Sequence, residues 1–104
     1  MSSETIIYNV ENNIASLTLN RPEKMNAFRL EEFDLLMGGI ALADNDPEIK
    51  VIKIRSTGNR AFSGGLDLGM LQELAGSPEK IPELLKTGEN VVKTIYKSKK
   101  PICN

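Results

Sequence analysis

Near the N-terminus, hydrophobic and polar positions alternate, which is the pattern of a half-buried β-strand. Two short runs rich in β-branched residues, Thr5–Val10 and Ile14–Leu19, flank the tripeptide Glu11-Asn12-Asn13. Because asparagine tolerates the left-handed backbone conformation that tight turns need, these two runs predict an antiparallel hairpin. The second run places its apolar side chains on one face of the strand, and we expect that face to be buried: Ala15, Leu17 and Leu19.

From Arg29 to Asp44, apolar residues recur at steps of three and four, which predicts an amphipathic helix. Gly38 and Gly39 in the middle of this helix cost roughly 1 kcal/mol each relative to alanine, so we expect the helix to pack closely against a neighbour there. The β-branched run within Lys50–Arg55 predicts a strand that returns after the helix. If this strand is parallel to the earlier one, the crossover should be right-handed.

The C-terminal third contains two further helical patterns and the start of a strand. A short helix is predicted to follow Asp67 and to break at Ala75-Gly76-Ser77-Pro78. A longer amphipathic stripe then runs to Lys99-Lys100-Pro101, and we expect its apolar residues to pack in the core: Ile81, Leu84, Leu85, Gly88, Val92, Ile95 and Tyr96. Ile102-Cys103 has the composition of a beginning strand, so the predicted order is β-β-α-β-α-α-β, an α/β fold.

The stretch Asn59–Leu68 is a glycine turn between the third strand and the short helix. Gly64-Gly65 has no Cβ atoms, so a ligand can approach the main chain closely there. Asp67 is a suitable N-cap, and the amide of Leu66 would lie at the positive end of the helix, where a carbonyl oxygen that gains negative charge is stabilised. The same pattern also fits an ordinary strand–turn–helix connection that carries no chemistry.

Composition narrows the class of protein. A chain of 104 residues forms one domain at most, and its net charge of −1 gives no reason to expect nucleic acid or a membrane as a partner. The only cysteine, Cys103, excludes an internal disulfide and suits a reducing compartment, and no export signal is visible, so we expect a cytoplasmic protein. A small basic cluster is interpreted as a solvated helix C-terminus: Lys93, Lys97, Lys99 and Lys100.

The chain contains no histidine, and this excludes several kinds of site. A Ser-His-Asp triad cannot form within it, so Ser63 is interpreted as a turn residue and not as a nucleophile. With one cysteine and no imidazole we expect no metal site. The glutamates on helical polar faces and in loops are interpreted as surface groups: Glu11, Glu31, Glu32, Glu48, Glu73, Glu79, Glu83 and Glu89.

Four blocks of sequence occur in an order and spacing that resemble the crotonase (enoyl-CoA hydratase/isomerase) superfamily. They are Asn-Arg-Pro-Glu-Lys-Met-Asn-Ala at 20–27, Asp-Pro-Glu-Ile-Lys-Val at 46–51, Ala-Phe-Ser-Gly-Gly-Leu-Asp-Leu at 61–68 and Lys-Pro-Ile at 100–102. The resemblance extends from about Ile6 to the last residue. Four motifs in register are far more specific than the glycine turn alone.

The resemblance implies a spiral of β-β-α units, present here as the incomplete N-terminal part of the ClpP/crotonase-type core. Residues 1–104 would then be the N-terminal part of a single crotonase-like domain, with no second domain. The implied ligand is an acyl-CoA thioester that serves as substrate, with no covalently bound cofactor. The implied assembly is a homo-oligomer, either a trimer or a dimer of trimers.

The resemblance also implies a set of site residues. The backbone N–H of Leu66 matches the first of two oxyanion donors that hold the thioester oxygen while an enolate forms. Gly64, Asp67 and Leu68 match positions that line the adenine and pantetheine groove, and Lys24, Met25 and Ala27 match its opposite wall. Arg60 matches a basic position near the phosphates, although it would serve equally well as a solvated turn residue. Asp67 is not expected to act as a catalytic base, because its N-cap role accounts for it.

The chain departs from the family pattern after Asn104, where the second oxyanion donor and the acid–base residues of hydratases would follow. We therefore expect the 104-residue chain alone to be inactive. Three hypotheses stay open: the N-terminal half of an acyl-CoA hydratase, isomerase or related hydrolase; a non-catalytic acyl-CoA-binding or interaction fragment; and a structural remnant that packs on a homologue. We favour the first hypothesis, because the strand that begins at Ile102 would otherwise leave an edge of unpaired backbone groups. Fold-level analogy alone cannot choose the reaction.

Overall fold

The computed structural model describes residues 4–58 and 65–103, which form four strands, three α-helices and two short 3-10 helices. The predicted order of strands and α-helices is confirmed. The bounds are β1 Ile6–Glu11, β2 Ile14–Leu19, η1 Pro22–Lys24, α1 Leu30–Asp44, β3 Val51–Ser56, α2 Leu68–Gly76, η2 Pro78–Lys80, α3 Ile81–Lys97 and β4 Ile102–Cys103.

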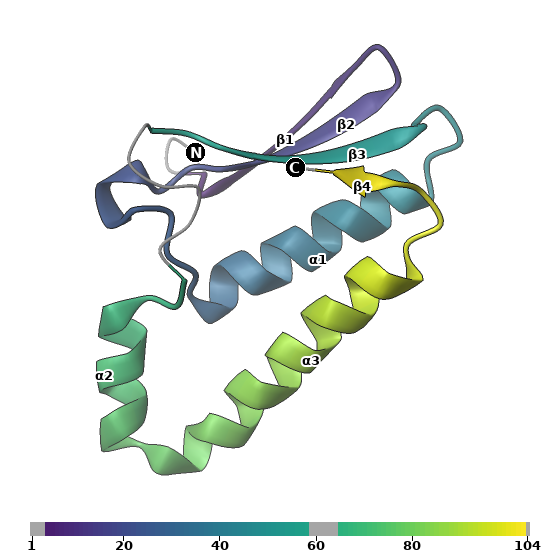
Figure 1. Cartoon of the computed structure of the whole chain (residues 1–104). Helices are drawn as coiled ribbons and strands as arrows, with labels where there is room; N and C mark the ends of the chain where they lie inside the picture. Colours follow the sequence, from purple (N-terminus) through teal and green to yellow (C-terminus); the bar gives the residue numbers. More distant parts are fainter. Residues whose placement is uncertain (1–3, 59–64, 104) are drawn as a thin grey trace.

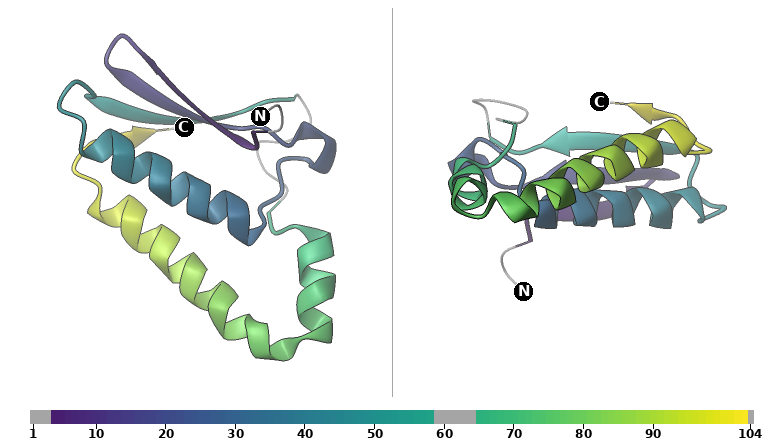
Figure 2. Two further views of the ribbon diagram at one scale, coloured as in Figure 1. Left: turned by 180° about the vertical axis from the view of Figure 1, so that it is seen from behind. Right: turned by 90° about the horizontal axis from the view of Figure 1, so that it is seen from below.

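The strands form one mixed sheet in the order β1-β2-β3-β4. β1 and β2 pair antiparallel, and the hairpin turn uses left-handed backbone at Asn12 and Asn13 (φ 53° and 66°), as predicted. β3 pairs parallel to β2, and β4 joins β3 in parallel through the pair Ile52–Ile102. α1 and α3 lie side by side on one face of this sheet, and α2 lies beyond one end of it (Figures 1 and 2).

The core lies between the sheet and the two long helices. Ala15, Leu17 and Leu19 are all buried, which confirms the predicted inward face of β2. Leu17 packs together with Ile40 of α1 and Ile52 of β3, and these are the largest fully buried side chains in the described part of the chain. Burying side chains of this size stabilises the fold by about 1.5–3 kcal/mol each.

Gly39 brings α1 close to β2, as the glycine pair predicted, but Gly38 does not. A Cβ atom added at Gly39 would overlap Leu17 Cδ2, whereas one added at Gly38 would meet nothing within 4 Å. Because Leu17 is fully buried, its side chain has little room to move away from such an atom. The close approach of α1 to β2 therefore explains the glycine at position 39 but not the one at position 38.

We expect Gly39→Ala to destabilise the protein by about 1–2 kcal/mol, because overpacking outweighs the gain of about 1 kcal/mol in helix propensity. Gly38→Ala is the matched control, and it should stabilise the protein by up to about 1 kcal/mol because its position is open. Urea unfolding of the two variants measures both changes. Equal effects at the two positions would contradict the packing that we describe.

The predicted core stripe of α3 is only partly correct. Val91 is the buried residue of this helix, although the sequence pattern pointed to Val92. Five of the seven predicted residues are exposed, so their interpretation as core residues is wrong for the described structure: Ile81 and Ile95 at 41% each, and Leu85, Val92 and Tyr96 at 68%, 66% and 88%. Val91 belongs to the core cluster, on a helix whose main packing partner is α1, and Leu85, Val92 and Tyr96 lie outside that cluster.

One lysine of the basic cluster, Lys100, is not part of a solvated helix end. Lys100 Nζ donates hydrogen bonds to the carbonyl oxygens of Ala43, at 2.6 Å, and Asp46, where α1 ends. The carboxylate of Asp44 in turn accepts from the backbone N–H of Lys99 at 2.9 Å, which lowers the pKa of Asp44. Lys100 therefore binds carbonyl oxygens at the C-terminus of α1, and this contact fixes the position where β4 begins.

Candidate functional site

The start of α2 is joined to the loop before α1 by a short parallel bridge between Phe28 and Leu66. The N–H of Phe28 donates to the carbonyl of Gly65 at 2.6 Å, and the N–H of Asp67 donates to the carbonyl of Phe28 at 2.7 Å. Gly65 has φ +90°, a conformation that residues with side chains rarely adopt. These two bonds hold the backbone on both sides of Leu66.

The orientation of the Leu66 amide follows from the planarity of the peptide bond. In a trans peptide the N–H points opposite to the preceding C=O, and the Gly65 C=O is directed at Phe28. The N–H of Leu66 therefore points away from Phe28, and it makes no hydrogen bond to any other residue of the described part of the chain. The Leu66 side chain is itself 40% exposed.

A cleft of about 520 Å³ lies where this turn meets the loop before α1. Six of the eight residues predicted for the site line this one cleft: Lys24, Met25, Ala27, Leu66, Asp67 and Leu68. The other two, Arg60 and Gly64, lie outside the described residues. Arg21, Arg29 and Gly69 also line the cleft, and they were not predicted for the site.

The loop wall of the cleft owes its shape to left-handed backbone at Met25 and Asn26, with φ of 53° and 55°. Asn26 is buried, and its side chain accepts from the Arg21 N–H at 2.7 Å and donates to the Thr57 carbonyl at 2.9 Å. An asparagine can occupy this conformation at low cost and also bond its own loop. Asn26 therefore ties the loop wall to the residue that follows β3.

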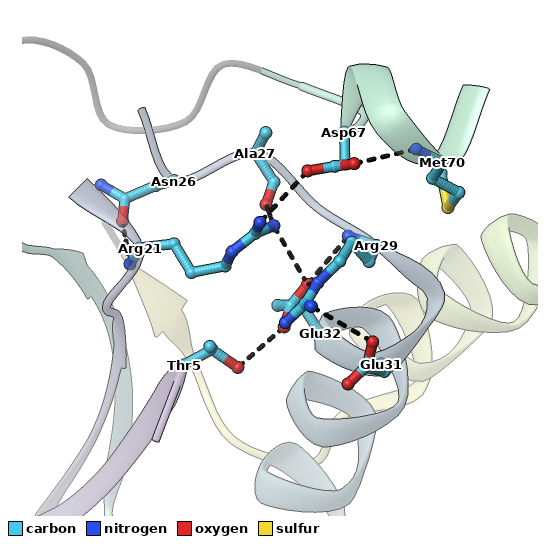
Figure 3. A network of polar contacts seen from close by, with 9 residues as sticks. All are labelled: Thr5, Arg21, Asn26, Ala27, Arg29, Glu31, Glu32, Asp67 and Met70. Carbon is cyan, nitrogen blue, oxygen red and sulfur yellow. Dashed lines mark hydrogen bonds and ion pairs between the residues drawn. The ribbon is translucent and has the colours of Figure 1, made fainter. Parts of the chain in front are cut away.

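Three of the residues that line the cleft, Arg21, Arg29 and Asp67, belong to a network of charged side chains (Figure 3). The guanidinium of Arg21 donates to the Ala27 carbonyl at 2.9 Å and to Asp67 Oδ2 at 3.2 Å, and it lies 3.5 Å from Glu32 Oε1. Its side chain is only 10% exposed. One buried cation thus contacts the loop wall, the start of α2 and the first turn of α1.

Glu32 is the buried anion of this network, so its interpretation as a surface group is wrong. It is 3% exposed and accepts hydrogen bonds from Thr5 Oγ1 at 2.8 Å and from the side chain and backbone N–H of Arg29. Burial alone would raise the pKa of Glu32, but the bonds from Arg29 and Thr5 outweigh it and lower the pKa to about 2. The other seven glutamates are exposed, as predicted.

Asp67 caps α2, as predicted, because its Oδ1 accepts from the N–H of Met70 at 2.9 Å. This bond, together with the one from Arg21, lowers the pKa of Asp67. A carboxylate held in its ionised form by both bonds is a poor proton acceptor at neutral pH. The structure therefore gives Asp67 a role in fixing the backbone next to Leu66.

Two general properties of the molecule concern what it can bind. Among residues 4–58 and 65–103, no group of three or more His, Cys, Asp or Glu side chains is placed to hold a metal ion. None of the helices in this part of the chain is long and apolar enough to cross a bilayer.

The fold is that of crotonase-type proteins. The chain superposes with a TM-score of 0.90 on the crystal structure of a candidate enoyl-CoA hydratase/isomerase (crotonase) from Legionella pneumophila, at 29% identity over 97% of this chain and 39% of that one. It superposes with a TM-score of 0.84 on enoyl-CoA hydratase from Bacillus halodurans, at 26% identity over 96% of this chain and 41% of that one. The β-β-α organisation predicted from the sequence is thereby confirmed.

The sequence itself matches the family model for enoyl-CoA hydratase/isomerase over residues 9–104, and the chain belongs to that family. It is 33% identical over 100 residues to trans-2-decenoyl-[acyl-carrier-protein] isomerase of Streptococcus mutans, a match that covers 96% of this chain and 37% of the relative. It is 28% identical to crotonyl-CoA hydratase of Syntrophomonas wolfei, over 98% of this chain and 38% of the relative. The chain thus spans less than two-fifths of the length of these relatives.

Proposed function

We propose that this chain supplies one half of an acyl-thioester site, in which the Leu66 N–H donates to the thioester carbonyl oxygen of an acyl-CoA. The observation that carries the proposal is the Leu66 amide, which is held by the bonds of its neighbours, has no acceptor among the described residues and belongs to a residue that lines the cleft. A fixed donor of this kind costs no reorganisation when the carbonyl oxygen becomes negative.

The charges around the cleft favour one direction for the ligand. Lys24 lies on the loop wall of the cleft, while Glu31 and Glu73 line a neighbouring depression of about 580 Å³. CoA carries negative phosphates, so the side of Lys24 attracts them and the side of the two glutamates repels them. We propose that the CoA phosphates lie toward Lys24, with Met25, Ala27, Asp67 and Leu68 along the pantetheine. Gly64 and Arg60 complete this site in the proposal.

The chemistry that we propose is hydration or double-bond migration of an enoyl thioester through an oxyanion-stabilised enolate. This reaction needs a second N–H donor and a general acid–base group, and we assign neither to the described residues of this chain. We propose that both come from another segment of polypeptide, either within the same crotonase-like domain or from a partner in a trimer or dimer of trimers. The 104 residues alone should then bind the acyl thioester without turning it over. We also propose that the protein is cytoplasmic and uses no covalently bound cofactor.

A thioester of acyl carrier protein is the second candidate ligand. The relative from Streptococcus mutans is an acyl-carrier-protein isomerase by name, and the match between the two proteins covers 96% of this chain and 37% of that relative. Both carriers present an acyl group on phosphopantetheine, so the same cleft would bind either of them.

A different candidate function is an acyl-CoA-binding fragment without any catalytic role. It differs from the first proposal in one result: no assembly that contains this chain would turn the thioester over.

The test is amide NMR of the isotope-labelled chain during titration with crotonyl-CoA, crotonyl-acyl-carrier-protein and free CoA. We expect crotonyl-CoA to shift the amide signals of Leu66, Met25 and Ala27. Free CoA should shift the signals of the loop wall but leave Leu66 unchanged, because it has no thioester carbonyl. Binding of crotonyl-CoA that leaves the Leu66 amide unperturbed would overturn the proposed function.

A further inference from the structure

We propose that Arg21 is the positioning residue that fixes the direction of the Leu66 amide. The inference rests on the proposed function, since it concerns the same donor, but it assigns a role to a side chain that never has to touch the ligand. In this role the guanidinium joins the two backbone segments that frame Leu66 and anchors both of them to α1.

The contacts of Arg21 lie immediately beside the Phe28–Leu66 bridge. The guanidinium bonds the carbonyl of Ala27, which precedes Phe28, and the carboxylate of Asp67, which follows Leu66, at 2.9 and 3.2 Å. Each segment of the bridge is therefore held by one hydrogen bond from the same cation. Figure 3 shows the Ala27 oxygen and the Asp67 carboxylate converging on this one guanidinium.

The third contact supplies an anchor outside the cleft. Glu32 lies in the first turn of α1, and its Oε1 is 3.5 Å from Arg21 Nη1. Because Arg29 holds the carboxylate of Glu32 with three hydrogen bonds, the Arg21 guanidinium has a fixed partner on the helix side. A planar fork of donors meets three acceptors in three directions, which the single ammonium of lysine cannot reproduce.

Arg21 also lines the cleft, and we assign it a positioning role because its guanidinium contacts acceptors inside the protein on both sides of Leu66. Its side chain is 10% exposed, and the three acceptors lie on three different segments of the protein. A buried ion pair is also weak grounds for stability alone, since its desolvation offsets most of the Coulomb attraction. The arrangement of Arg21 and its three acceptors instead holds the turn that carries Leu66 in one backbone conformation.

The experiment measures the infrared band of the thioester carbonyl in crotonyl-CoA, isotope-labelled at the carbonyl carbon and bound to the 104-residue chain. In the unmodified chain we expect the band to move to lower frequency on binding, because the Leu66 N–H polarises the carbonyl. In Arg21→Lys we expect more than half of that shift to be lost, while the affinity for free CoA stays close to that of the unmodified chain. Retention of the full shift in Arg21→Lys would overturn the role of Arg21.

Two further variants separate positioning from stability. Thr5→Val removes a hydrogen bond to Glu32 without touching Ala27 or Asp67, so it should lower stability and leave the carbonyl band unchanged. Asp67→Asn keeps a side-chain oxygen for the N-cap but weakens the link to Arg21, so it should lose part of the shift even if Arg21→Lys fails to fold. A carbonyl band that moves equally in Thr5→Val and Asp67→Asn would show a merely structural effect and overturn the inference.

Failure of the proposed function gives a different result from failure of this inference. If the unmodified chain binds crotonyl-CoA with no shift of the carbonyl band, the Leu66 donor is wrong and the inference about Arg21 falls with it. If the unmodified chain shows the shift and both Arg21→Lys and Asp67→Asn keep it, the Leu66 donor stands and only the role of Arg21 is rejected.

Discussion

Replacing Glu32 by glutamine is expected to cost about 3–5 kcal/mol of folding free energy, because it removes the anion from a buried ion pair. The carboxylate accepts from Thr5 and Arg29 and lies beside Arg21, so all of its neighbours are donors. A glutamine would turn its own N–H₂ group toward at least one of them. Since a domain of ordinary stability has about 5–15 kcal/mol in total, this loss would bring the protein close to unfolding.

The matched control is Glu31→Gln, one residue earlier in the same turn of α1. Glu31 also pairs with Arg29, at 3.4 Å, but its side chain is 69% exposed. An exposed pair contributes about 0–1 kcal/mol, so this variant should unfold almost as the unmodified chain does. Urea unfolding at neutral pH measures both. Equal losses in the two variants would show that the buried network does not stabilise the fold.

The same carboxylate predicts how stability depends on pH. The pKa of Glu32 is about 2 in the folded protein against 4.5 as its ordinary value, so its contribution is complete above pH 4.5 and is lost as the pH falls toward 2. A difference of this size corresponds to about 3 kcal/mol. Asp67, whose pKa is also lowered, adds a loss in the same direction.

Stability measured from pH 5 to pH 2 should therefore fall steeply in the unmodified chain and in Glu31→Gln, but less steeply in Glu32→Gln. Unfolding curves in urea at a series of pH values give this slope directly. If Glu32→Gln keeps the full acid sensitivity, the loss of stability at low pH comes from other carboxylates.

The sequence contained a signal for Glu32 that its polar character concealed. Glu32 is in phase with Leu36, Ile40 and Ala43, the buried residues of α1, at steps of four, four and three. An acidic residue on the apolar stripe of a helix needs a buried cation, and Arg21 lies in the motif just upstream. Periodicity identifies such a position, but only the tertiary structure shows that the guanidinium reaches it.

Whether another feature of the fold could be predicted depended on how far apart in the sequence its interacting residues lie. Local features were predictable, such as the left-handed Asn12 and Asn13 turn and the Asp67 N-cap, because they depend on neighbouring residues alone. The choice between Val91 and Val92 was not, since both are apolar and the packing of α3 decides between them. The bond from Lys100 to the end of α1 spans 57 residues and leaves no trace in local sequence.

The residues of the candidate site could be predicted only where they belong to recognisable sequence motifs. Lys24, Met25 and Ala27 lie about 40 residues from the glycine turn in sequence, yet they share one cleft with Leu66, Asp67 and Leu68. The motifs identified these positions because they match a family pattern and not because spacing alone brings them together. The sequence did not identify Arg21, Asn26 and Glu32 as part of the site, because a buried polar side chain looks like a surface residue in sequence.

Replacing the Leu66 amide by an ester is expected to lower turnover by about 10²–10³-fold in the active assembly that we propose, which corresponds to about 2.7–4 kcal/mol. The substitution uses the α-hydroxy acid analogue of leucine, which removes the N–H and keeps the side chain. Proline would also remove the N–H, but its ring constrains the turn at Gly65. The ester thus tests the donor itself.

The control for the ester is Leu66→Ala, which keeps the N–H and loses only a side chain that is 40% exposed. The ester also makes the Gly65 carbonyl a weaker acceptor for the Phe28 N–H, so thermal unfolding of both variants is compared first. Free CoA should bind the ester and the unmodified chain equally well, because it lacks the carbonyl that the amide would meet. If the ester lowers turnover no more than Leu66→Ala does, the oxyanion is stabilised by a different group and the assignment of Leu66 is wrong.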